Sequence, residues 1–482
     1  MPQASGNHRR GKACVIGSGP NGLAAAIVLA QAGLDVEVFE AEPEIGGATR
    51  TLDLTLPGFH HDFGSAVHPL AVGSPFFSSL PLADYGLEWI HSPSTLAHPF
   101  DDGTAITLDR DLTQTEAALG EDGPAWRRLM QPLATRWPDF TANILRPAIA
   151  FPKHPFLLAR FGLNALLPAT TVARRFSTEP ARALFAGLAA HSFMALNQPL
   201  SASFGLVLGA AAHAVGWPIP HGGAQSLANA LAAHLDHLGG RITTSTRIRS
   251  LTDLPASDLT LCDITPRQLL TLAGESSPNK LSPTYRRQLA AYKYGPGAFK
   301  VDYALSSPIP WNAPACRRAA TVHLGGTLAE IAASESTMSS GQHSAKPFVL
   351  LAQPTLFDPT RAPAGKHIAW AYCHVPNAST EDMLDRLESQ IERFATGFRA
   401  TILARHISSP STLEAMDANL VGGDIGGGAV NLRQFLFRPT RRQYRTSAPD
   451  IYLCSSSTPP GGGVHGMCGA NAARTALRHL QR

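Results

Sequence analysis

Short apolar runs of strand length alternate with longer alanine-rich segments at both ends of this 482-residue chain. Residues 13–16 (ACVI) are apolar and branched, residues 23–33 (LAAAIVLAQAG) are rich in alanine, and residues 34–40 (LDVEVFE) alternate between apolar and polar side chains. This order predicts a buried parallel strand, a helix and a second strand. Toward the other end, residues 450–454 (DIYLC) predict a strand and residues 472–480 (AARTALRHL) predict a helix.

The middle of the chain differs, with apolar helical stretches and few alternating runs. Residues 151–176 mix bulky hydrophobic side chains with lysine and arginine, which favours a pair of lid helices over an apolar pocket. The alternative is a basic amphipathic patch that makes peripheral contact with an anionic membrane. Residues 204–217 are too short and too rich in glycine to span a bilayer, so we expect a buried core segment there.

Composition narrows the class of protein. Hydrophobic residues make up 44% of the chain and charged residues 16%, as in a globular protein with a large core. The net charge of +4 arises from 40 basic and 36 acidic residues, a balance that argues against nucleic-acid binding. The first twelve residues form a polar tail without an apolar run, which predicts a cytoplasmic protein without a signal peptide.

The six cysteines are scattered along the chain. They form no CxxC pair and no cluster with histidine, so we predict no metal site and no disulfide framework.

A glycine-rich turn lies between the first predicted strand and helix. Gly17 permits a tight turn, Gly19 lets the backbone approach a pyrophosphate, and Gly22 lets the helix pack closely on the strand. The helix N-terminus offers free N–H groups to phosphates. Glu40, at the end of the second strand, is placed to accept hydrogen bonds from a ribose diol. We therefore assign a dinucleotide site to the turn Gly17, Gly19, Pro20, Asn21 and Gly22, together with Glu40.

A second motif follows directly. Gly46, Gly47, Thr49 and Arg50 resemble the second FAD motif of the glutathione-reductase-type flavoproteins. The resemblance implies that the glycine pair passes close to the cofactor and that Arg50 contacts its phosphate region. The disulfide reductases of that group carry a CxxxxC pair soon afterwards. This chain has no cysteine between positions 14 and 262, so dithiol chemistry is excluded.

The glycine-rich segment 458–469 (TPPGGGVHGMCG) lies between the last predicted strand and helix. Together with residues 17–26 (GSGPNGLAAA) and 45–51 (IGGATRT), it resembles the phytoene-desaturase-like flavoproteins of the flavin amine oxidase superfamily. Within them the chain looks like the branch of the pyridine nucleotide-disulphide oxidoreductase domain-containing proteins. The resemblance extends over essentially the whole chain.

This resemblance implies an α/β fold with a glutathione-reductase-like, Rossmann-type FAD-binding domain built from discontinuous segments. We expect that domain to comprise residues 11–75, 216–295 and 441–482, and an α+β substrate-binding domain with a helical lid to comprise residues 76–215 and 296–440. FAD is expected to bind without a covalent link, and the resemblance implies a strand around Arg247 and Ile248 on its adenine side. Further cofactor contacts are expected from Gly64, Ser65, Ile248, Thr458, Gly463, Val464, His465, Gly466 and Met467.

Two residues are candidates for catalysis. Lys300, on the alternating run 297–303, resembles the strand lysine of flavin amine oxidases, although an exposed strand lysine is the alternative. His465 is a candidate proton shuttle, and a histidine that only bonds the backbone is the alternative. His68, Trp217 and His221 are weaker candidates for the wall of a substrate pocket.

The expected function is that of an FAD-dependent oxidoreductase that transfers hydride from a small hydrophobic substrate (a polyene, isoprenoid or lipid-like molecule) to flavin N5. The second glycine cluster, residues 422–428, does not follow a clear strand, so no second nucleotide domain is predicted. That favours oxygen or a quinone as the electron acceptor. A flavin amine oxidase, a redox-neutral double-bond isomerase and a low-turnover FAD-binding regulatory protein are the alternatives.

Overall fold

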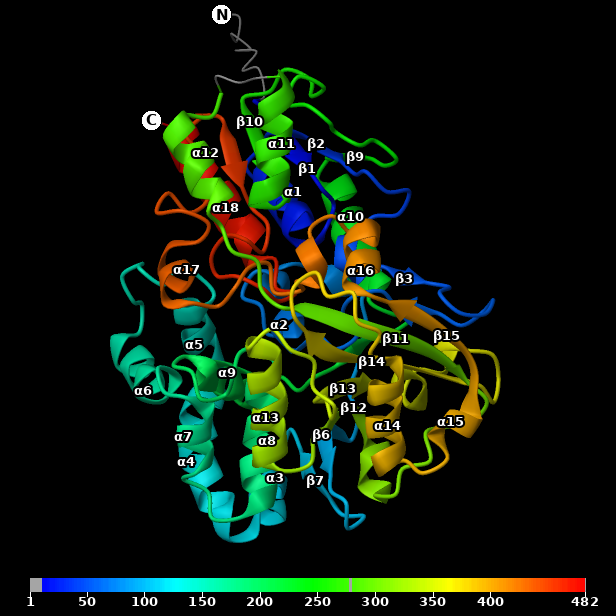
Figure 1. Ribbon diagram of the computed structural model, residues 1–482. Helices are drawn as coiled ribbons and strands as arrows, with labels where there is room; N and C mark the ends of the chain where they lie inside the picture. Colours follow the sequence, from blue (N-terminus) through cyan, green and yellow to red (C-terminus); the bar gives the residue numbers. More distant parts are fainter. Residues whose placement is uncertain (1–10, 277–279, 482) are drawn as a thin grey trace, which may run out of the picture.

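The computed structural model describes residues 11–276 and 280–481, which form two sheets with their covering helices (Figure 1). The first sheet has five strands in the order β16-β10-β1-β2-β9, and all neighbours are parallel. Its strands come from distant parts of the chain, so this part of the molecule is discontinuous in sequence. The strands are β1 (Lys12–Ile16), β2 (Asp35–Phe39), β9 (Arg241–Thr243), β10 (Leu259–Cys262) and β16 (Ile451–Leu453).

Helices cover both faces of this sheet, as a parallel sheet requires. On one face, α1 (Pro20–Gln31) packs between α10 (Gln225–His237) and α18 (Met467–Leu480). On the other face lie α11 (Pro266–Ser276) and α12 (Pro283–Ala290). The first strand, the first helix and the last helix are thus neighbours, and the predicted Rossmann-type α/β class is confirmed.

The second sheet is mixed and has seven strands in the order β15-β11-β14-β13-β12-β6-β7. Only the β12–β6 pair is parallel. One face packs on α14 (Leu384–Phe394), and the other faces the helical half of the molecule. The strands are β6 (Ser94–Pro99), β7 (Ala105–Leu108), β11 (Gly297–Leu305), β12 (Ala319–Leu324), β13 (Val349–Ala352), β14 (His367–Val375) and β15 (Ile402–Ser408).

The helices at the lower left of Figure 1 form the apolar core beside this sheet. They are α3 (Leu112–Ala118), α4 (Gly123–Ala134), α5 (Trp137–Ile144), α6 (Pro155–Ala165), α7 (Ala169–Ala173), α8 (Glu179–Ala190), α9 (Ser201–Ala214) and α13 (Leu328–Ser339). The short connecting elements are α2 (Pro69–Val72), α15 (Phe398–Thr401), α16 (Pro410–Met416), α17 (Leu432–Phe437), β3 (Thr51–Leu52), β4 (His61–Asp62), β5 (Trp89–Ile90) and β8 (Ile219–Pro220).

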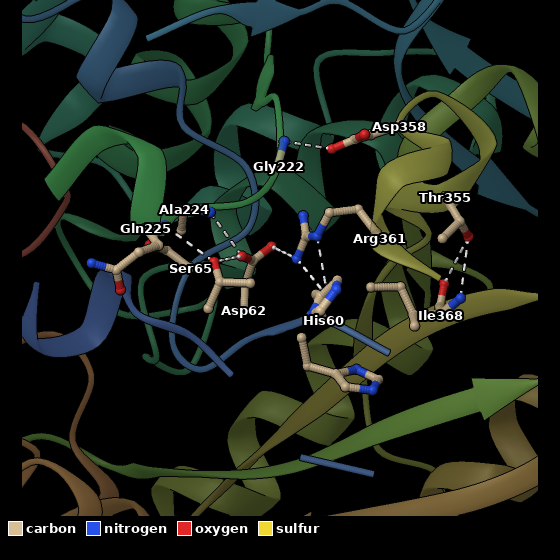
Figure 2. A network of polar contacts seen from close by, with 12 residues as sticks. His60, Asp62, Ser65, Gly222, Ala224, Gln225, Thr355, Asp358, Arg361 and Ile368 are labelled. Atoms are coloured by element: carbon tan, nitrogen blue, oxygen red, sulfur yellow. Dashed lines mark hydrogen bonds and ion pairs between the residues drawn. The ribbon is translucent and has the colours of Figure 1, made fainter. Parts of the chain in front are cut away.

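A buried polar network joins the two parts of the molecule (Figure 2). Asp62 on β4 and Arg361 on the loop after β13 form an ion pair of 2.9 Å, and both side chains are fully buried. Asp62 also accepts a hydrogen bond of 2.8 Å from the backbone N–H of Ala224, just before α10. Asp358 accepts one of 2.8 Å from the N–H of Gly222. The start of α10 is therefore held by carboxylates from two separate segments.

One expected strand is absent. The resemblance implied a strand around Arg247 and Ile248, but β9 ends at Thr243 and residues 244–250 are irregular. Ser245 has a φ of 52°, a left-handed conformation that interrupts extended backbone. The N–H of Thr246 then donates to the carbonyl of Glu40 at 2.7 Å, which holds the irregular segment beside β2.

Candidate active site

A large cavity of about 1270 Å³ lies between the two parts of the molecule. At one end its wall is formed by the first glycine turn, Gly47 and the end of β2. At the other end the wall is formed by α6, α9 and one face of the seven-stranded sheet. Loops 424–430 and 455–465 line the region between, so the glycine cluster 422–428 contributes to this same cavity.

The phosphate-binding turn has the close packing that its glycines predicted. Gly17 has a φ of 95°, and a Cβ on Gly22 would lie 2.0 Å from the carbonyl oxygen of Gly17. Gly17, Gly19, Pro20 and Asn21 line the cavity, where α1 presents its N-terminus. Gly22 packs behind them instead of lining the cavity.

Glu40 lies where a ribose acid is expected. It is buried at the end of β2 and lines the cavity with Ile248. Its Oε2 accepts hydrogen bonds from the N–H and hydroxyl of Ser18, at 2.8 and 2.6 Å. Its Oε1 accepts one from the N–H of Glu42 at 3.0 Å. Each carboxylate oxygen has two lone pairs, so Oε1 keeps one for a ligand hydroxyl.

Arg50 and Gly47 form the adjoining wall, whereas Gly46, also predicted to contact the cofactor, lies behind it. The guanidinium donates from Nε to the carbonyl of Gly47 at 2.9 Å and from Nη2 to that of Met416 at 2.6 Å. It lies over the Phe63 ring at 5.1 Å. These contacts fix the plane of the group and leave Nη1 for a phosphate oxygen. Thr49 lines the same wall and donates to the carbonyl of Gly46 at 2.7 Å.

Asp263 was missed from the sequence. It follows β10 directly, lines the cavity and accepts a hydrogen bond of 2.7 Å from the N–H of Gly22. Burial raises the pKa of Asp263 to about 8, with smaller contributions from Asp417 and Glu40. The carboxyl therefore holds its proton more tightly than an exposed aspartate does. An acid at the carboxyl end of a parallel strand, as in LTLCD (259–263), was the signal that could have identified it.

The C-terminal loop contributes some, but not all, of its predicted contacts. Gly463, Val464 and His465 line the cavity. The predicted contacts Thr458, Gly466 and Met467 lie behind this wall, and Gly466 (φ 66°) begins the turn into α18. Gly64 and Ser65, also predicted, do line the cavity.

His465 is a neutral, fixed group. Burial lowers the pKa of His465 to about 4, and its Nδ1 accepts a hydrogen bond of 3.0 Å from the N–H of Met467. The ring therefore carries its proton on Nε2. Hydrogen bonds to the backbone of Gly461 and Gly462 oppose this lowering, so both sides of the ring bond the surrounding loop, in agreement with the alternative of a histidine that only bonds the backbone.

Lys300 is buried, and the alternative of an exposed strand lysine is wrong. Only 3% of the residue is accessible, and it lines the cavity. Its ammonium donates to Asp302 Oδ2 at 2.5 Å and lies over the Trp370 ring at 5.7 Å. Burial raises the pKa of Asp302, and the charge of Lys300 opposes that rise. Asp302 Oδ1 lies 3.7 Å from His61 Nδ1.

Of the three weaker candidates for the wall of the substrate pocket, two line the cavity and one does not. His68 and Trp217 line the cavity, and His68 donates from Nε2 to the carbonyl of Ser65 at 3.2 Å. Burial lowers the pKa of His68 to about 4. His221 lies outside the lining, with 49% of its side chain exposed and 4.0 Å from Asp358. It precedes Gly222 (φ 75°) in a surface turn after β8, which explains why it does not reach the pocket.

The substrate end of the cavity is apolar and has no negative charge. Alternate residues of β11, β14, β13 and β12 form its floor, while α6 and α9 cover it. Among the described lining residues in the ranges 143–217 and 298–372, none is aspartate or glutamate. The acidic lining residues are Glu40, Glu42, Glu44, Asp263, Asp417 and Asp424, all in the other segments.

The outer surface around α6 is apolar and basic. Phe151 and Phe156 are 87% and 89% exposed, and Leu163 is 75% exposed. Lys153 and Arg160 are exposed beside them. In the described part of the chain, no helix combines the length and hydrophobicity needed to cross a bilayer.

Comparisons with known proteins agree with this geometry. Residues 15–77 match the model of the NAD(P)-binding Rossmann-like domain. The chain is 28% identical to mouse (Mus musculus) pyridine nucleotide-disulfide oxidoreductase domain-containing protein 2, over 97% of this chain and 94% of the mouse protein. It is 25% identical to the lycopene-forming phytoene desaturase of Pseudescherichia vulneris, over 97% of this chain and 98% of the desaturase.

A solved structure of putrescine oxidase shares the fold, with a TM-score of 0.61 at 16% identity over 98% of this chain and 99% of the oxidase. The resemblance inferred from the sequence is confirmed. Over nearly its whole length the chain is similar to pyridine nucleotide-disulfide oxidoreductase domain-containing protein 2 and to phytoene desaturase, and it shares the fold of putrescine oxidase.

Proposed function

We propose that this protein binds FAD without a covalent link and removes hydride from a neutral, hydrophobic substrate. The observation that carries the proposal is the continuity of one cavity from the dinucleotide turn, past Lys300, to an apolar sheet face. Its volume of about 1270 Å³ exceeds that of a pocket for one small ligand, which is roughly 300–1,000 Å³. It therefore has room for a cofactor and a substrate together.

The residues at the nucleotide end fit FAD. The α1 N-terminus and Arg50 Nη1 offer donors to a pyrophosphate, and Glu40 Oε1 offers an acceptor to a ribose hydroxyl. The C-terminal loop continues the wall toward Lys300 with Gly463 and His465. When bound, FAD supplies the hydride acceptor, its N5 atom.

The chain's own residues supply position, charge and a dry site. Lys300 keeps a positive charge on the cavity wall, held by Asp302 and Trp370. A fixed charge in a water-poor site acts more strongly on charge developing in a reaction than it does in water. His465 is held by the backbone of its own loop, and α6 and α9 limit the access of water.

The substrate is proposed to be neutral because a buried cation needs a partner. No carboxylate among the described residues lines the substrate end, so an ammonium group finds no counter-ion there. Oxygen or a quinone is proposed as the electron acceptor, because the glycine cluster 422–428 lines the same cavity and builds no second nucleotide site.

Anaerobic bleaching of the flavin absorbance tests this proposal. The FAD-loaded protein is mixed with polyenes, isoprenoids and neutral lipids, and separately with primary amines. We expect bleaching by at least one neutral class and none by the amines. Lys300→Met is expected to slow bleaching by about 10²- to 10³-fold, the effect of removing one preorganised charge or donor. Lys366→Met, at an exposed lysine, is the matched control.

Three other outcomes would contradict the proposal. Bleaching by amines alone would indicate an amine oxidase. Turnover that requires prior reduction but consumes no reductant would indicate an isomerase. Tight FAD binding without bleaching by either panel would favour the regulatory alternative.

A further inference from the structure

A pair of histidines closes the substrate end of the cavity, and the proposed hydride transfer does not use it. His191 caps α8, and His323 lies on β12. Their Nε2 atoms are 3.0 Å apart, a hydrogen bond in which one ring must donate and the other accept. His191 also packs edge-on against Trp217, with ring centroids 5.6 Å apart. His191 and Trp217 line the cavity, and His323 lies behind them.

Both rings are neutral. Burial lowers the pKa of His191 to about 3 and that of His323 well below its ordinary value. A neutral imidazole has one N–H donor and one acceptor nitrogen. The position of one proton between the two Nε2 atoms therefore fixes the tautomer of both rings.

The surroundings of His323 decide which of the two Nε2 atoms carries the proton between them. Its Nδ1 is buried without a hydrogen-bond partner among the described residues. A Cβ built on Gly187 of α8 would lie 2.7 Å from this atom, so the nitrogen packs directly against the helix. A buried N–H without an acceptor is costly, whereas an unprotonated nitrogen tolerates neighbouring C–H groups. His323 therefore carries its proton on Nε2 and donates it to His191.

This leaves His191 with its own proton on Nδ1. That atom has no hydrogen-bond partner among the described residues. It is also not fully buried, so it is accessible. His191 lies deep in the molecule and lines the cavity, so the space open to Nδ1 is the cavity itself. The hydroxyl oxygens of Ser192 and Thr321, two other residues of the lining, are fully buried, so they do not compete with His191 Nδ1 for a ligand.

The register of the sheet gives the distance between Lys300 and His323, the residue that is hydrogen-bonded to His191. Lys300 pairs with Tyr372, Tyr372 with Leu350, and Leu350 with His323, across β11, β14, β13 and β12. Three steps of about 4.8 Å between strands separate Lys300 from His323 by about 14 Å. The donor at His191 and the charge at Lys300 thus lie at opposite ends of an apolar floor.

We propose that the His191 Nδ1–H binds a neutral oxygen at one end of an extended, otherwise apolar substrate. The group is a carbonyl, ether or hydroxyl oxygen, and the rest of the molecule lies along the floor toward Lys300. This inference rests on the proposed function, because it specifies the substrate of the same cavity. An ammonium group has no lone pair to accept this hydrogen bond, so cationic ends are excluded there.

Equilibrium binding without turnover tests the proposal. The probes are a medium-chain alkane with the ketone, alcohol and amine of the same chain length, and the readout is quenching of tryptophan fluorescence in the FAD-loaded protein. We expect the ketone and alcohol to bind about two- to tenfold more tightly than the alkane, the effect of one hydrogen bond. In His191→Phe, which keeps the aromatic packing, we expect the ketone and alcohol to bind no more tightly than the alkane. His237→Phe, at an exposed histidine of α10, keeps it.

The tautomers are tested independently with ¹⁵N-histidine NMR. We expect a protonated Nδ1 on His191 and a protonated Nε2 on His323, with His191→Phe and His323→Phe used for assignment. An unprotonated His191 Nδ1, or equal affinity for alkane and ketone, would overturn the inference. Bleaching without an oxygen preference would refute this inference alone, whereas an oxygen preference without bleaching would refute only the proposed function.

Discussion

The two ends of the cavity are built in different ways. The nucleotide end consists of short loops after parallel strands, in which backbone groups and glycines make close contacts. The substrate end consists of side chains from four strands of a mixed sheet and from helices that pack on it. A site built from backbone loses function when any Cβ is added, whereas a site built from side chains changes its preference with each substitution.

The largest effect is expected at the first glycine turn. Gly22→Ala places a Cβ 2.0 Å from a backbone oxygen, so the turn must open and the phosphate site is lost. We expect no FAD in the purified variant, measured as flavin per protein chain. Gly162→Ala, at the substrate end, has no atom within 4 Å of the new Cβ and is expected to retain FAD. Full FAD content in the Gly22 variant would show that this end is not built as described.

A second prediction concerns the ion pair that holds the two parts together. Arg361→Ala leaves the fully buried Asp62 without its ion-pair partner, and breaking such a pair lowers the free energy of unfolding by about 3–5 kcal/mol. Arg241→Ala removes an exposed pair with Asp35 and is expected to cost about 0–1 kcal/mol. Urea denaturation measures both. Equal effects would mean that the buried network contributes no more than a surface pair.

A third prediction addresses the outer side of the substrate end. Leu166 both lines the cavity and is 59% exposed, so the apolar surface around α6 reaches the substrate site. The membrane contact expected from the sequence stays a prediction. Phe151→Ser with Phe156→Ser is expected to weaken binding to vesicles containing phosphatidylserine about tenfold or more, since each buried phenylalanine contributes about 1.5–3 kcal/mol. Leu480→Ser, at an exposed leucine of α18, is the control, and vesicle sedimentation measures binding. Unchanged binding of the double variant would mean that α6 only covers the pocket and does not contact the membrane.

The smallest effect is a pH dependence at the nucleotide end. The pKa of Asp263 is about 8 in the folded protein and 3.8 in an exposed carboxyl, so the folded state holds the proton more tightly. The stability of the ligand-free protein should therefore fall as pH rises from about 4 to 8. Buried histidines with lowered pKa, such as His191 and His465, have the opposite effect below about 6.5.

The window from pH 6.5 to 8 separates the two contributions. There we expect the melting temperature of the wild type to fall by a few degrees and that of Asp263→Asn to stay level, because the amide keeps an acceptor for Gly22 and has no proton to lose. Asp236→Asn, at an exposed acid of α10, should follow the wild type. The same slope in the Asp263 variant would assign the change to another group.

The sequence predicted the nucleotide end well because its residues lie in contiguous motifs. Gly17, Glu40 and Arg50 are each identified by their neighbours in the chain, and each lines the cavity. The same local motif also continues past the cavity wall, where Met467 lies. The prediction of a strand near Arg247 was wrong because Ser245, in a left-handed conformation, interrupts the extended backbone.

The substrate end could not be predicted in the same way. The packing of α8 on the sheet brings His191 to His323, and the register of β12, β13 and β14 aligns His323 with Leu350 and Tyr372 on one face. No spacing along the chain encodes these contacts. Lys300 was identified by its strand, but its burial depends on the helices that cover the sheet, which the strand pattern does not reveal.

The absorption spectrum of the purified protein, recorded before and after denaturation with chromatography of the released material, tests the central claim most directly. The account predicts flavin bands in the native protein and about one FAD per chain in the supernatant. A colourless protein that cannot be reconstituted with FAD would contradict it, and would leave the glycine turns as structural features only.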